Sequence, residues 1–200
     1  MSTTFRFRLP AALALGALLA AWGLPAEAHL LNAGNAGAAQ GFAHPFSGLD
    51  HILAMVAVGL WAAQIGRRAL WMLPLAFPLS MAAGGLLGMG GVALPGVETG
   101  IGASVMLLGL LIALVARPPL PIATALVVMF AIFHGHVHGT ELPQAASPVL
   151  YGLGFVAATA LLHVIGLGIG QLLKLPQGQV AVRAGGAGIA AAGAILLLGF

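Results

Sequence analysis

Residues 120–141 read LPIATALVVMFAIFHGHVHGTE, an apolar run that leads directly into three histidines and a glutamate. A membrane-spanning helix needs about 20 mostly apolar residues, and this run is close to that length. Its polar end then lies near one membrane surface. The stretch therefore predicts an all-α membrane protein whose chemistry is gathered at one end of its helices.

The rest of the chain has the same character. Of its 200 residues, 60% are hydrophobic and 6% are charged, whereas about a quarter of the residues in a soluble domain are charged. Charged residues and Pro/Gly clusters divide the chain into six apolar runs, each long enough for a helix. These runs cover residues 46–64, 69–90, 99–116, 120–137, 148–170 and 184–200. We expect one membrane domain and no soluble one.

Charge and cysteine content exclude several classes of protein. The isoelectric point near 10.7 rests on seven Lys and Arg residues against four acids, and these form no basic patch, so we expect no nucleic-acid partner. The chain has no cysteine, which excludes disulfides and thiolate metal sites. Any metal chemistry must come from the seven histidines and the acids.

The first 28 residues are typical of a signal peptide. Arg6 and Arg8 form a basic start, residues 11–22 an apolar core, and Ala26-Glu27-Ala28 a cleavage signal. Cleavage leaves a mature domain of residues 29–200 with six helices. Uncleaved, the segment would form a seventh, rather short helix.

The positive charges fix the expected topology. With a mature N-terminus outside, the loops alternate so that every basic residue of the mature chain falls on the cytoplasmic side, as the positive-inside rule requires. These residues are Arg67, Arg68, Arg117, Lys174 and Arg183. We expect a multi-pass protein of the bacterial inner membrane with both ends periplasmic.

Glycines and prolines mark where helices approach or bend. Three glycine pairs have the four-residue spacing that lets helix backbones pack closely: Gly84 and Gly88, Gly135 and Gly139, and Gly166 and Gly170. Pro74 and Pro78 each remove a backbone hydrogen bond from the second run. We expect a kink there that shapes a cavity.

Residues 44–51, HPFSGLDH, form the first candidate metal site. In an unbroken helix His44 and His51 are two turns apart, about 10 Å, which is too far for one shared ion. Pro45 and Gly48 can break that turn and fold His44 back. We take Asp50 and His51 as the core of the site, with a helix-capping Asp beside an interfacial His as the alternative.

The second candidate site follows the fourth run. His134, His138 and Glu141 have the i, i+4, i+7 spacing of one helix face, and His136 projects to the opposite face. Imidazole and carboxylate together suit nickel, zinc, cobalt or copper(II). The alternative is an interfacial histidine cluster that binds water or lipid headgroups.

The sequence leaves the roles of three further polar residues open. Glu98 precedes the third run, where a carboxylate either stabilises the helix N-terminus or binds metal. His163 stands alone within the fifth run, where a packing group is more usual than a ligand, and a relay role stays open. His29 would begin the mature chain, where its imidazole and free α-amino group could capture metal, but the Gly/Ala content of this segment favours a flexible tail.

The motifs around His44, Asp50 and His51, and from Phe133 to Glu141, resemble the signatures of the HupE/UreJ family of nickel permeases. The resemblance extends over nearly the whole mature chain. It implies a six-helix inner-membrane protein that lets nickel, or cobalt in some members, enter without pumping, for a nickel-iron hydrogenase or urease. It also implies metal-pathway roles for seven residues, with Phe77 as a pathway aromatic. The seven are His44, Asp50, His51, Glu98, His134, His138 and Glu141.

The sequence thus predicts a transporter and not an enzyme, with the metal ion as cargo and no permanently bound cofactor. An intramembrane metalloenzyme is the main alternative, but His134 is not followed by the Glu of an HExxH site. A G-x-S-x-G nucleophile motif is also absent from the sequence. A metal sensor or partner subunit that does not transport is the other alternative. The expected partners are the bilayer and the metal ion, and a homo-oligomer stays open.

Overall fold

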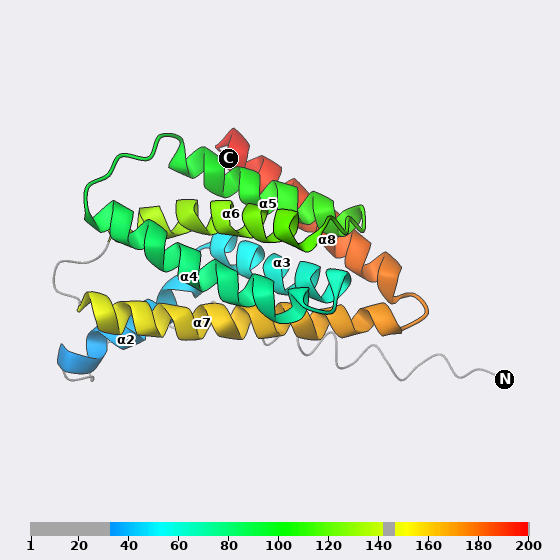
Figure 1. Ribbon diagram of the computed structural model, residues 1–200, viewed down its shortest axis with the longest axis horizontal. Helices are drawn as coiled ribbons and strands as arrows, with labels where there is room; N and C mark the ends of the chain where they lie inside the picture. The colour runs from blue at the N-terminus through cyan, green and yellow to red at the C-terminus, as the bar shows by residue number, and fades with distance from the viewer. Residues whose placement is uncertain (1–32, 142–146, 200) are drawn as a thin grey trace. The chain divides into compact units, whose positions relative to one another are not determined.

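The computed structural model describes residues 33–141 and 147–199, and these contain helices and no strand (Figure 1). The α-helices are α2 (Ala33–Ala43), α3 (Leu49–Ile65), α4 (Ala69–Met89), α5 (Val97–Ala113), α6 (Leu120–Thr140), α7 (Pro148–Ile169) and α8 (Gly178–Leu198). Two 3₁₀ helices, η3 (His44–Phe46) and η4 (Gly170–Lys174), follow α2 and α7. The predicted all-α class is confirmed. The predicted signal peptide and His29 lie outside the described residues.

Each of the six predicted runs forms a helix, but not all six are long enough to cross a membrane alone. Four helical segments are long and apolar enough: α4, α6, α7 with η4, and α8. The bent pair formed by residues 37–46 and 49–65 makes a fifth if it counts as one span. Helix α5 has 17 residues, fewer than the roughly 20 of a full span. The membrane character is confirmed, and the number of six spans stays a prediction.

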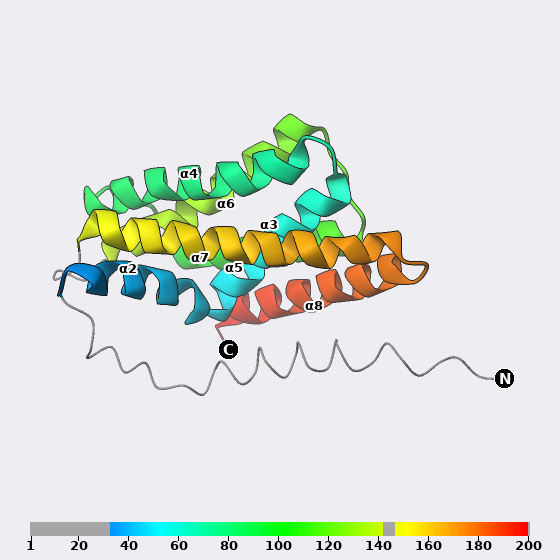
Figure 2. The ribbon, with the colours of Figure 1, turned by 90° about the horizontal axis from the view of Figure 1, so that it is seen from below.

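The helices pack in pairs through their glycines (Figures 1 and 2). Helix α4 lies along α6, α5 along α8, and α7 contacts both α2 and α3. A Cβ on Gly135 would collide with the Met81 carbonyl of α4, and one on Gly166 would collide with the Val56 carbonyl of α3. The close approach predicted from the three glycine pairs is present in each of them: Gly84 and Gly88 face α6, Gly135 and Gly139 face α4, and Gly166 and Gly170 face α3.

The segment before His44 differs from the prediction. The Gly/Ala content suggested a flexible tail, yet residues 33–43 form α2, which packs against α7. Gly41 and Gly154 explain this, because a Cβ on either would collide with the backbone of the other helix. The small residues that suggested flexibility serve here to let two helices touch.

The predicted break between His44 and His51 is present. Pro45 lies in η3, Gly48 is extended with ψ of 129°, and the helices on either side are bent by 80°. The chain therefore turns by nearly a right angle before α3 begins. This bend lets His44 approach residues of α3.

All five basic residues of the described chain lie at or near the α3–α4, α5–α6 and α7–α8 junctions, which share the right-hand end of Figure 1. Trp61 Nε1 donates to the Ala116 carbonyl at 2.9 Å, and Arg183 Nε donates to the Ala113 carbonyl at 2.8 Å. Helix α8 begins at Gly178, earlier than the predicted residue 184. It includes Arg183, whose long side chain can extend along the helix and keep its charge near that end of the bundle. Which side of the membrane this end faces stays a prediction.

Candidate metal centre

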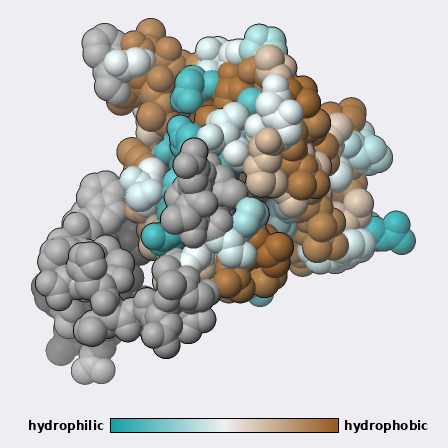
Figure 3. Space-filling model, turned by 90° about the vertical axis from the view of Figure 1, so that its left-hand side faces the viewer, coloured by the Kyte–Doolittle hydropathy of each residue, from teal (hydrophilic) through white to brown (hydrophobic). Residues whose placement is uncertain are grey.

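The opposite end, where α4 ends and α7 begins, carries the predicted site residues. Figure 3 views this end and shows hydrophilic residues interspersed among apolar ones. Seven residues were predicted to act on metal, and the structure places them in three groups. His44, His51 and His138 come together, His134 lies behind them, and the three acids lie around them.

His44, His51 and His138 form the three-histidine cluster. One ring nitrogen from each lies within 4.8 Å of the other two. The Nε2 atoms of His51 and His138 are 2.7 Å apart, and the ring centroids of His44 and His138 are 4.8 Å apart. His51 and His138 are buried, and His44 is half-buried. The bend at Gly48 and the packing of the helices thus bring η3, α3 and α6 together at one point.

Within the cluster, His51 and His138 are close to the spacing that a shared metal ion needs, and the ring of His44 would have to move closer to join them. Imidazole nitrogens bind first-row metals at about 2.0–2.1 Å, so two ligands on one ion are about 3.0 Å apart at right angles and about 3.4 Å apart at a tetrahedral angle. The 2.7 Å between the two Nε2 atoms has to widen by only a few tenths of an ångström. Small rotations of the two rings would provide that.

Asp50 lies behind His51 and not among the three nitrogens. Its Oδ2 is 2.8 Å from His51 Nδ1. A carboxylate at Nδ1 favours the tautomer with the proton there, which leaves the Nε2 lone pair for a metal; such outer partners orient metal-binding histidines. Asp50 is therefore positioned to orient His51, and its predicted role as a direct ligand stays a prediction.

His134 lies one helical turn deeper in α6 than His138. It is fully buried, and its Nδ1 donates to the Phe130 carbonyl at 3.0 Å. Its Nε2 has no hydrogen-bond partner within residues 33–141 and 147–199, and its ring centroid is 5.7 Å from that of His51. His134 therefore presents a free nitrogen on the inner side of the cluster. As predicted, it shares a buried helix face with His138.

The acids lie around the cluster. Asp50 and Glu98 line a cavity of about 450 Å³ that α5 and the end of α8 enclose. Glu98 is exposed at the start of α5, and Glu141 is exposed directly after α6. Two carboxylates thus share one cavity, where they would attract a cation, and one of them, Asp50, also contacts His51.

His136 has a different partner from its neighbours. Its Nε2 donates to the Val92 carbonyl at 2.6 Å, which ties α6 to the loop between α4 and α5. This agrees with the expectation that His136 points away from His134 and His138.

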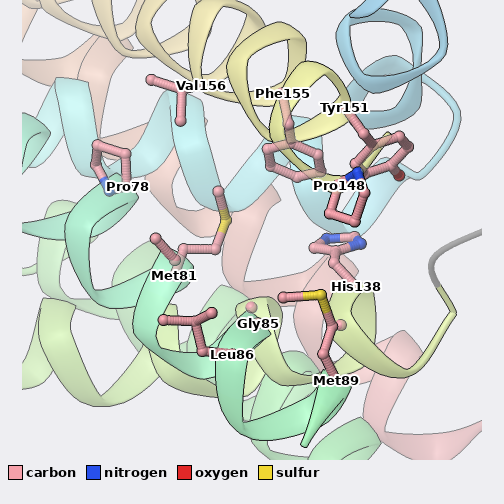
Figure 4. A pocket seen from close by; sticks show the side chains of 13 residues that line it. Pro78, Met81, Gly85, Leu86, Met89, His138, Pro148, Tyr151, Phe155 and Val156 are labelled. Atoms are coloured by element: carbon pink, nitrogen blue, oxygen red, sulfur yellow. The ribbon is translucent and has the colours of Figure 1, made fainter. Parts of the chain in front are cut away.

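Sequence reasoning missed the aromatic wall of the site. Tyr151 and Phe155 of α7 lie against His44, each with ring centroids 5.9 Å from it, and Phe155 also lies 4.6 Å from His138. His138, Tyr151 and Phe155 also line an apolar cavity of about 250 Å³ with Met81 and other residues (Figure 4). The one sequence signal was the i, i+4 spacing of the two aromatic residues at the outer end of their run.

The arrangement has the donor set to bind a divalent transition metal. Three neutral imidazoles satisfy three coordination positions and leave others for water or a carboxylate, as in metal sites that exchange a ligand. The donor set fits nickel, cobalt, zinc or copper(II). An ion held by three side chains from three segments can be released when one of them moves.

Comparison with known proteins identifies the family to which the chain is similar. A family described as HupE / UreJ protein matches residues 13–196. A curated relative, Protein HupE of Rhizobium leguminosarum bv. viciae, is 51% identical over 182 residues, which cover 90% of this chain and 95% of the relative. No solved structure shows significant similarity to the chain. With a family match over almost its whole length and a relative at this identity, the chain belongs to the HupE/UreJ family and is a multi-pass membrane protein.

Proposed function

We propose that the chain lets Ni²⁺ cross the bacterial inner membrane into the cytoplasm, with Co²⁺ as an alternative cargo, and so supplies a nickel enzyme such as a hydrogenase or urease. The observation that carries this proposal is the three-histidine cluster, in which His44, His51 and His138 come from separate segments with ligand nitrogens within 4.8 Å of one another. Membership of the HupE/UreJ family supports nickel as the cargo.

The surroundings of the cluster favour passage over permanent storage. Asp50 lines a cavity together with Glu98 and lies 2.8 Å from His51 Nδ1, and His134 has a free nitrogen on the inner side of the cluster. Intramembrane histidines and acids usually mark ion pathways. An ion can thus pass from carboxylates to the cluster and then further into the bundle.

Purified protein in liposomes that contain a nickel-quenched dye tests this directly. We expect Ni²⁺ added outside to quench the dye, and His138→Ala to slow quenching by at least about tenfold, the scale of loss from damaging a metal site. Ser104→Ala is the matched control, because Ser104 is equally buried but bonds only to the Ile101 carbonyl of its own helix. Binding of Ni²⁺ without quenching would favour a sensor or partner subunit, and neither binding nor quenching would refute the proposal.

A further inference from the structure

His163 is a buried polar residue that the three-histidine cluster does not use. It lies in the inner half of α7 with 1% of its surface exposed. Neither ring nitrogen has a hydrogen-bond partner in the described part of the chain. Leaving a buried polar group unpaired costs about 1–3 kcal/mol, and a leucine here would avoid that cost. The side chain therefore needs an explanation other than packing.

Two other polar groups lie near His163 in the bundle, one on α7 and one on α4. Thr159, one turn earlier on the same face of α7, is fully buried, and its Oγ1 also has no partner among the described residues. In α4, Pro78 has no N–H to donate to the Pro74 carbonyl four residues earlier, and Phe77 of the same helix lies against the His163 ring. An imidazole, a hydroxyl and a freed carbonyl are together donors that a divalent transition metal accepts.

Phe77 connects this region to the outer site. Its ring is fully buried and lies 5.8 Å from the ring of His134 and 5.4 Å from that of His163, measured between centroids. The Phe77 and His163 rings are almost perpendicular, at 89°. One aromatic ring thus separates the free Nε2 of His134 from the two free nitrogens of His163.

We propose that His163 is a second, inner binding site for the transported metal, which the ion reaches from His134 by passing the ring of Phe77. This inference rests on the proposed transport function. With one imidazole and weak oxygen donors, the inner site binds the ion more loosely than the outer cluster. A loose inner site lets the ion continue toward the cytoplasm.

Flux and binding measured together separate this inference from the proposed function. In the liposome assay, His163→Leu should slow Ni²⁺ entry by at least about tenfold, while Ni²⁺ affinity of the outer cluster, measured by calorimetry on the same protein, changes by less than about twofold. His163→Gln keeps the side chain polar and should show the same separation if the leucine variant folds poorly. If wild-type protein carries no Ni²⁺, the proposed function fails. If wild type transports and both His163 variants match it, only the present inference fails.

A thiol at the same position gives a readout other than transport. The chain has no cysteine, so His163→Cys introduces a single metal-binding thiol. We expect Cd²⁺ to slow its modification by methyl methanethiosulfonate by about fivefold or more, because an occupied thiolate cannot react. Ser104→Cys, a buried position on α5, should show no Cd²⁺ protection. A His163→Cys thiol that Cd²⁺ does not protect, or that the reagent never reaches, would overturn the inference.

Discussion

Replacing Asp50 by Asn tests how the acid acts, because the change removes a charge and keeps the volume. Asp50 Oδ2 is 2.8 Å from His51 Nδ1, and an amide oxygen at that place can still accept a hydrogen bond from a protonated Nδ1. What is lost is the carboxylate charge behind the imidazole. Loss of such an outer partner typically costs 10–100-fold in metal affinity, or about 1.4–2.7 kcal/mol.

The exposure of Asp50 narrows this range. Its side chain keeps 22% of its surface exposed, and solvent and salt screen an exposed charge more than a buried one. We therefore expect Asp50→Asn to weaken Ni²⁺ binding by about 10–30-fold, the lower part of the range for outer partners. The same factor should appear in the Ni²⁺ concentration that gives half-maximal uptake into liposomes.

A double-mutant cycle with His51→Ala decides between an orienting role and direct ligation. If Asp50 acts through His51, Asp50→Asn should cost less than about 0.5 kcal/mol once the imidazole is absent, because the two residues then share one effect. If Asp50 binds the metal itself, the two losses should add. The orienting role would be contradicted if the losses of Ni²⁺ affinity in the two single variants, measured by calorimetry, add up in the double variant. It would also be contradicted if the Asp50→Asn protein binds Ni²⁺ as tightly as wild type.

Four further predictions follow from the packing and from the site. Gly135→Ala should destabilise the protein by about 1–3 kcal/mol through overpacking against α4 and lower its melting temperature in detergent, whereas Gly152→Ala, which has open space, should not. His138→Gln should reduce Ni²⁺ uptake far more than His136→Gln; an equal loss would place His136 in the pathway. Reporter fusions after Arg117 should be cytoplasmic and those in the α4–α5 loop periplasmic, and the reverse result would invert the proposed direction of access. Uptake should fall as external pH is lowered because protons compete with metal for imidazole, whereas uptake that rises on acidification would indicate proton coupling.

The sequence predicted the helices well because each apolar run is bounded by charges or by Pro/Gly clusters. The fourth run was predicted to cover residues 120–137 and forms α6, Leu120–Thr140. The break after His44 was also predictable, since Pro45 and Gly48 have known backbone consequences. Local chemistry decided both features, so no information about distant contacts was needed.

Other features depend on contacts between distant segments. Asp50 and His51 are neighbours in sequence, and only the packing of α3 against the rest of the bundle determines which of them faces His138. The wall made by Tyr151 and Phe155 has the same origin, because two aromatics in an apolar run do not reveal which helix they contact. Helix α2 was missed since its glycines disfavour a helix locally, and their small size becomes favourable only when α7 packs against them.

The bend at Gly48 links the packing of α2 to the chemistry of the site. His44 follows α2 directly, and α2 is held against α7 by the close approach at Gly41 and Gly154. His51 and His138 belong to α3 and α6, so the cluster is complete only when α2 and η3 are in place. An ion bound by all three histidines would stabilise the position of α2 that places His44 next to His51 and His138. Because such coupling is reciprocal, displacing α2 would cost metal binding the same free energy that the bound ion contributes to holding α2 in place. We therefore expect a bulkier residue at Gly41, which would push α2 away from α7, to weaken metal binding.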